Sequence, residues 1–290
     1  MGLRSIISLA AALLAMSACA NKGGPPGPQR TVVTTMSTLA SLVQMVSGDR
    51  WQVVNLVPVG ASPEDYQPSP RDIEALRRAQ ILVENGAGIE VWLNHLLDAA
   101  RNINMQVVVA TQGVQLKDGN PHVWMDPVAA QEYLKKIEAA LERADPEGTP
   151  YYRTRLQTAI QQLQALDAAV RSQIKTIPPG ARNMIVFHNA WQYYADRYSL
   201  RVVGAIELSP GQEPSPQYLS KLVKLAKSHH VRVIFAEPEY NKKLATVLGE
   251  SAGIKTVSNL YDDSLGTSPE VKDYISLITY DTNVIVNALK

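Results

Sequence analysis

The stretch TPYYRTRLQTAIQQLQALDAAVRSQIK, residues 149–175, decides how this chain is divided. It has no glycine and no proline after Pro150, and its apolar side chains recur at steps of three and four: Tyr152, Leu156, Ile160, Leu163, Leu166, Val170 and Ile174. This period predicts a single helix that opens at Pro150 and closes before Pro178. At a rise of about 1.5 Å per residue, its roughly 26 residues span about 39 Å, which predicts a rigid connector between two halves.

Both flanks of this segment alternate short β-branched runs with segments of helical period, the pattern of parallel α/β units. The expected strands are 32–34, 53–57, 81–83, 107–110, 184–187, 202–206, 231–236 and 254–257, and the expected helices include 37–46, 72–79, 89–100, 129–144, 216–228 and 241–251. We therefore predict an α/β fold with two lobes of mostly parallel sheet, helices on both faces, and one long rigid helix joining them. The lobes are expected at 31–148 and 178–290, with the connector at 149–177. The alternative is a long helix packed on one large domain.

Composition excludes several classes of protein. Lys plus Arg number 28 and Asp plus Glu 27, so the net charge of +1 gives no electrostatic footprint for nucleic acid. The 290 residues, 46% of them hydrophobic, are ample for a buried core. A single cysteine excludes an intrachain disulfide framework and a cysteine-based zinc cluster.

That cysteine, Cys19, follows a segment typical of export signals. A basic start is followed by a short apolar run and by small residues up to Ala18, and the run is too short to span a bilayer. Small residues directly before a cysteine resemble a bacterial lipobox, so we expect a signal peptide at 1–18 and an acylated Cys19. The Gly- and Pro-rich stretch 19–30 is expected to be a tether. An ordinary signal peptide with an incidental cysteine is the alternative.

Four polar stretches follow expected strands, and in open α/β sheets ligands bind beyond the carboxyl ends of the strands. They carry Glu64 and Asp65, then His122 and Asp126, then His188, and finally Asp262 and Asp263. Two imidazoles and two carboxylates delivered by separate loops would form a four-ligand site for a divalent transition metal. Each residue also has an ordinary structural interpretation as a turn, capping or core residue. The other imidazoles, at 95, 229 and 230, are expected on the surface or at helix ends.

At these residues the chain resembles the metal-specific substrate-binding lipoproteins of bacterial ABC importers, the cluster A-I type that takes up zinc and manganese. The resemblance covers essentially the whole mature chain and rests on LVPVG (56–60), PxxYxPxPxD (63–72), NGAGIEVW (85–92), NPHVWMDP (120–127), FHNAWQYYADRY (187–198), EPSP (213–216) and IFAEP (234–238). It implies two α/β lobes joined by a rigid backbone helix, with the metal between the lobes and two ligands from each.

Carried over by position, the resemblance implies His122, His188 and Asp263 as ligands, with Asp262 the second choice for the last. The first ligand is normally a histidine, and this chain has Glu64 there, with Asp65 beside it. Glu64 can take over the histidine's role, with Asp65 as the neighbour able to substitute. Alternatively, three protein ligands remain and water fills the fourth place, or the site has weakened. The short stretch 114–120 also lacks the His- and acid-rich loop of many zinc-binding members. Asp126 and Glu237 are candidates to orient an imidazole or to balance charge.

The resulting prediction is an exported, lipid-anchored, monomeric capture protein that is not an enzyme and uses no organic cofactor. It binds Zn²⁺, with Mn²⁺ close behind, and delivers the ion to a membrane permease of an ABC importer at the periplasmic or outer face of the membrane. Two alternatives belong to other classes. One is a metal-dependent hydrolase, although the sequence offers no nucleophile motif such as GxSxG. The other is a surface adhesion module that has lost its metal.

Overall fold

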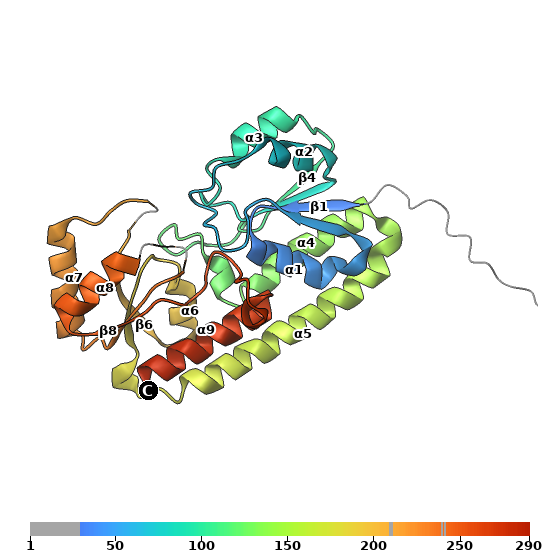
Figure 1. The fold of residues 1–290 in the computed structure, drawn as a ribbon. Helices are drawn as coiled ribbons and strands as arrows, with labels where there is room; N and C mark the ends of the chain where they lie inside the picture. The colour runs from blue at the N-terminus through green and yellow to red at the C-terminus, as the bar shows by residue number, and fades with distance from the viewer. Residues whose placement is uncertain (1–29, 209–210, 239, 241) are drawn as a thin grey trace, which may run out of the picture.

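The computed structural model describes residues 30–208, 211–238, 240 and 242–290, and these ranges form two α/β lobes along one long helix (Figure 1). Each lobe contains a four-stranded parallel sheet, in the orders β2-β1-β3-β4 and β6-β5-β7-β8. The first sheet consists of β1 (Thr31–Thr34), β2 (Gln52–Asn55), β3 (Ile81–Glu84) and β4 (Gln106–Val109). The second consists of β5 (Asn183–Val186), β6 (Arg201–Ala205), β7 (Val233–Phe235) and β8 (Lys255–Val257). The predicted fold class is confirmed.

Helices cover both faces of the first sheet, which is why all four residues of β1 are buried. The helices of this lobe are α1 (Ser37–Ser47), α2 (Pro70–Arg78), α3 (Leu93–Ala100) and α4 (Ala130–Ala144). One face packs Val33 and Leu82 against α2 and α3, and the other packs Val32 and Val83 against α1 and α4. A Ser69–Asp72 capping box and Pro70 at the first turn fix the start of α2.

The second lobe repeats this arrangement with α6 (Gln192–Tyr198), α7 (Pro216–Ser228) and α8 (Lys242–Ala252). The inward side chains of β5 and β7 divide between two cores. Ile185 and Ile234 pack with α7 and α8, whereas Val186 and Phe235 belong to the larger core on the other face. Short α6 was not predicted, because seven residues carry too little periodicity to stand out from a loop.

The connector predicted from residues 149–175 is α5 (Thr149–Ile174), a helix of 26 residues with proline in its first turn. Its buried stripe includes Tyr152, Leu163, Leu166, Val170 and Ile174, as the apolar period indicated, while Ala159 is buried in addition. Both lobes contribute to the same continuous core along this helix. The lobes are therefore joined by packed side chains as well as by the chain itself.

A second helix, α9 (Tyr274–Leu289), lies beside α5 and was not among the predicted helices (Figure 1). Its sequence, YISLITYDTNVIVNAL, is rich in β-branched residues, which favour strands by local propensity. An Asp273–Ser276 capping box and packing against α5 overcome that preference. The helix begins against the first lobe, where the Tyr274 backbone N–H donates to Ser41 Oγ over 2.8 Å. The last part of the chain therefore returns from the second lobe to the first.

Polar contacts tie the lobes to the long helix as well. Arg197 of α6 lies 3.2 Å from Asp126 of the first lobe and 2.9 Å from Asp167 of α5. At the other end, the Tyr152 hydroxyl of α5 donates to Asp145 of the first lobe and accepts from Trp51 Nε1 over 2.7 Å. Both lobes therefore contact α5 through polar side chains as well as through the apolar core.

Residues 1–29 lie outside the described part of the chain, so the predicted signal peptide, Cys19 and all of the tether except Arg30 are not placed. Across the described ranges, no helix combines the length and apolar character required to span a bilayer.

Candidate metal centre

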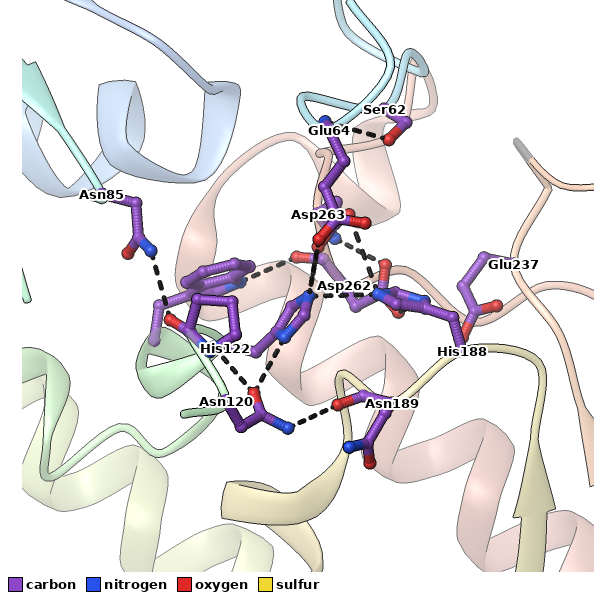
Figure 2. A network of polar contacts seen from close by, with 12 residues as sticks. Ser62, Glu64, Asn85, Asn120, His122, His188, Asn189, Glu237, Asp262 and Asp263 are labelled. Atoms are coloured by element: carbon purple, nitrogen blue, oxygen red, sulfur yellow. Dashed lines mark hydrogen bonds and ion pairs between the residues drawn. The ribbon is translucent and has the colours of Figure 1, made fainter. Parts of the chain in front are cut away.

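Four loops at the carboxyl ends of strands converge between the lobes (Figure 2). Glu64 lies in the loop after β2, and His122 directly precedes the short 3-10 helix η2 (Val123–Met125) after β4. His188 follows β5 by two residues, and Asp263 lies in the loop after β8. Two side chains therefore come from each sheet, because parallel strands end at the same edge.

The side-chain atoms of these four residues form a compact cluster. The Nε2 atoms of His122 and His188 are 3.1 Å apart. Asp263 Oδ1 lies 3.4 Å from His122 Nε2, and Glu64 Oε1 lies 3.9 Å from the same nitrogen. One ligand atom from each of the four lies within 4.8 Å of the others. Both imidazoles and Asp263 are buried, and the Glu64 side chain is 10% exposed. The structure thus brings together the four side chains that the sequence singled out.

Asn120 fixes the orientation of the His122 ring. Its Oδ1 accepts from the His122 backbone N–H over 3.0 Å and lies 2.9 Å from His122 Nδ1. Because that oxygen is an acceptor, the imidazole proton belongs on Nδ1, and the lone pair of Nε2 points into the cluster. The Asn120 amide also donates to the carbonyl of Asn189 over 2.6 Å. Asn120 therefore holds the His122 ring and links it to the loop that carries His188.

His188 lies against a buried pair of acids. Its Nδ1 is 3.3 Å from Asp262 Oδ2, and Glu237 lies in the same group. Trp191 Nε1 donates to Glu237 Oε1 over 2.9 Å. Burial lowers the pKa of His188 to about 4, so this imidazole is neutral at pH 7 and able to ligate a metal. Burial, with repulsion from Asp263, raises the pKa of Asp262 to about 7.

Asp262 and Asp263 point to different places, although they are adjacent. Asp263 faces both imidazoles, with Oδ2 3.8 Å from His188 Nε2. Burial works to raise the pKa of Asp263, but the imidazoles outweigh it and hold the pKa below its usual range. Asp262 instead turns behind His188, and its carbonyl accepts from Trp124 Nε1 over 2.9 Å. The geometry thus favours Asp263 for direct ligation and Asp262 for support.

Glu64 occupies the position where the family pattern has a histidine, and its surroundings disfavour a negative charge on its side chain. Burial, followed by repulsion from Asp263 and Asp262, raises the pKa of Glu64 to about 9. Its Oε2 and Asp263 Oδ1 are buried without a hydrogen-bond partner. Buried acceptors that face one another without donors are costly. A divalent cation among them would remove that cost, so the donor set suits a metal.

The other predicted supporting residues have different positions. Asp65 is exposed and lies outside the group of four. Asp126 does not contact an imidazole but accepts from the Val128 backbone N–H over 2.8 Å and pairs with Arg197. The expectation that Asp126 orients an imidazole is therefore not met, because the turn before α4 directs its carboxylate toward α6. Glu237 lies behind Asp262, where it can balance charge.

Two residues of the site were missed by sequence reasoning. Asn120 precedes His122 by two positions inside the NPHVWMDP motif, which was the available signal. Tyr240 has its ring 5.1 Å from the His188 ring, and its hydroxyl lies 3.5 Å from Asp263 Oδ2. No spacing or motif pointed to Tyr240, which reaches the site only through the fold.

Fold and site together define a two-lobed binding protein with a cleft whose donors suit a divalent cation. Residues 32–288 match the model of the family described as ZnuA, zinc-uptake complex component A periplasmic, and the chain belongs to this family.

Two relatives match the chain over nearly its whole length. The chain is 31% identical over 310 residues to the high-affinity zinc uptake system protein ZnuA of Bacillus subtilis, covering 97% of this chain and 96% of that one. It is 28% identical over 292 residues to the manganese-binding lipoprotein MntA of Halalkalibacterium halodurans, covering 98% and 97%. The fold is similar to that of the periplasmic zinc-binding protein TroA of Treponema pallidum, with a TM-score of 0.82, 23% identity, and coverage of 90% and 99%.

Proposed function

We propose that this protein captures a divalent transition metal between its lobes and delivers it to the permease of an ABC importer. The observation that carries the proposal is the convergence of two neutral-capable imidazoles and two carboxylates, two from each lobe, on one point. The uptake and metal-binding names of its relatives support the same function. We propose capture without catalysis, in keeping with those names.

The proposed ligands are Glu64, His122, His188 and Asp263. Asn120 and Asp262 would orient the two imidazoles, as groups behind metal-bound histidines commonly do. Glu64 would enter the complex as a carboxylate, so metal binding would release the proton that Glu64 carries in the free protein. A family position normally held by histidine would thus be filled by a charged oxygen ligand.

Between the two candidate ions, we propose Zn²⁺ as the preferred cargo, with Mn²⁺ second. Four residues that each give one atom would complete the tetrahedral shell that zinc favours. If both carboxylates bound through two oxygens, the site would offer six atoms and suit Mn²⁺ better. Relatives of both kinds occur, one named for zinc and one for manganese.

For the whole chain, we propose a signal peptide at 1–18, a lipid-anchored tether at 19–30 beginning with acylated Cys19, lobes at 31–148 and 178–290, and the connector at 149–177. The name of one relative as a lipoprotein supports an exported, membrane-anchored location. The helix α9 lies within the range of the second lobe, but its first residue also contacts the first lobe through Ser41. We further propose that the protein acts as a monomer.

The test is metal analysis of the purified protein, followed by competition titration of Zn²⁺ against Mn²⁺ with a chelating dye. We expect one tightly bound equivalent in the unmodified protein and no stoichiometric binding in His122→Ala or His188→Ala. His95→Ala is the matched control, because it removes an exposed imidazole of α3. Retention of full affinity in both site variants would refute the ligand assignment.

A further inference from the structure

Another acidic side chain of the second lobe, Glu207, lies at the entrance to the proposed metal site. Glu207 lies just after β6, and together with Glu64, His122 and His188 it lines a cavity of about 210 Å³. Leu208, which is 65% exposed, lies at the same rim. The cavity is therefore continuous from the imidazoles to the surface, and Glu207 borders the path.

One oxygen of the Glu207 carboxylate is buried without a hydrogen-bond donor. The residue is only 9% exposed, and its Oε2 is buried without a hydrogen-bond partner. The backbone N–H of Gly211 donates a hydrogen bond to the Glu207 carboxylate. Within the described part of the chain, no lysine or arginine forms an ion pair with this carboxylate. A buried carboxylate oxygen without a donor is costly unless a ligand completes it.

Glu64 lines the same cavity, and the exposed Asp65 lies close enough to Glu207 to interact with it electrostatically. The Asp65 carboxylate repels Glu207, and both disfavour the charged form of Glu64, so the three carboxyl groups lie near one another. They come from opposite lobes, since Asp65 and Glu64 follow β2 and Glu207 follows β6. Glu207 is not among the side chains whose ligand atoms lie within 4.8 Å of one another. The space is thus too wide for direct ligation by all three acids but suits a cation that keeps its water.

We propose that Glu207, with Asp65 and Glu64, forms an outer station that holds a divalent cation with its water shell before the ion moves inward to the two imidazoles. The inference rests on the proposed metal capture at the inner site. Six waters occupy about 180 Å³ at the volume of liquid water, so the cavity of about 210 Å³ has room for a hydrated ion. Metal-bound waters donate hydrogen bonds to the Glu207 carboxylate. Glu64 belongs to both sites and passes the ion inward as water is lost.

This station has a distinctive ion preference. Its donors are all carboxylate oxygens, so it does not discriminate zinc from hard cations such as Mg²⁺, which retains its waters readily. Selection for a transition metal then occurs only at the imidazoles. The outer carboxylates also concentrate cations at the entrance and so act mainly on the rate of capture.

The experiment measures association of Zn²⁺ with metal-free full-length protein by stopped flow with a chelating dye, at low and high salt. We expect Glu207→Gln to slow association about fivefold at low salt, with the difference disappearing near 1 M salt. Millimolar Mg²⁺ slows the unmodified protein more than Glu207→Gln. Glu250→Gln is the control, because it removes an exposed charge at the far end of α8.

Asp65→Asn provides a second variant that cannot disturb the core, since Asp65 is exposed. It should slow association in the same sense. Equal rates for the unmodified protein and both variants, with one equivalent of Zn²⁺ still bound, overturn the station and leave the capture function standing. Absence of tight Zn²⁺ or Mn²⁺ binding by the unmodified protein overturns both. Slowing of equal size in Glu250→Gln would show a general charge effect and refute the station.

Discussion

Replacing Glu64 by glutamine should stabilise the metal-free protein while weakening metal binding. In the metal-free fold the pKa of Glu64 is raised to about 9, against about 4.5 for a glutamate in water. A carboxyl group with a raised folded pKa binds a proton on folding, so its presence lowers stability as pH rises from about 4.5 to about 9. Glutamine has nearly the same shape and carries no charge to desolvate.

The magnitude follows from that shift. Each pKa unit corresponds to about 1.4 kcal/mol, so at pH 8 the upper limit for the effect is about 5 kcal/mol. The amide still needs hydrogen-bond partners, and we therefore expect Glu64→Gln to raise the free energy of unfolding by about 2–4 kcal/mol. For a chain of this size that corresponds to a rise in Tm of about 4–10 °C. Metal affinity should fall more than about 100-fold, because loss of a direct ligand exceeds the usual loss from a supporting group.

The assay is thermal unfolding followed by circular dichroism, on chelator-treated protein between pH 5 and pH 9. The difference in Tm between Glu64→Gln and the unmodified protein should be small at pH 5 and grow steadily to pH 8. Glu147→Gln, which alters an exposed acid just before α5, should show no such growth. A lower Tm for Glu64→Gln, or a difference independent of pH, would contradict the assigned environment of Glu64.

Three further outcomes are expected. Asn120→Ala should keep one metal site but weaken its affinity about 10- to 100-fold in dye competition, because the His122 ring loses its hydrogen-bonded orientation; unchanged affinity would count against that role. Trp191→Phe should lower the free energy of unfolding by about 1–3 kcal/mol in urea titration, since Glu237 loses a buried donor, and equal stability would contradict this. Arg197→Met should cost about 1–3 kcal/mol with unchanged metal stoichiometry, because Asp126 and Asp167 lose their shared cation; loss of the bound metal would instead tie this contact to the site.

The candidate site could be predicted in part because its residues lie in turns and at strand ends, which the sequence marks clearly. His122 lies in a Pro-bounded turn and His188 at the end of an apolar strand, and chemistry at strand ends is a general property of parallel sheets. The family resemblance ranked Asp263 before Asp262, but the residues by themselves did not separate the two, because adjacent side chains diverge only once the loop after β8 has a conformation. Tyr240 gave no signal for the same reason. Its position depends on packing, with its ring stacked on Phe187 at a centroid distance of 5.1 Å.

The sequence by itself determined the eight strands, their parallel arrangement and the long helix, because these follow from local apolar periodicity and from the absence of breakers between Pro150 and Lys175. Only the tertiary structure decided that the β-branched stretch Tyr274–Leu289 is a helix beside α5, since packing there overrides local propensity. The tertiary structure also decided that four loops bring Glu64, His122, His188 and Asp263 close together. Distances between segments far apart in sequence depend on how the two lobes pack along α5, which no local pattern encodes.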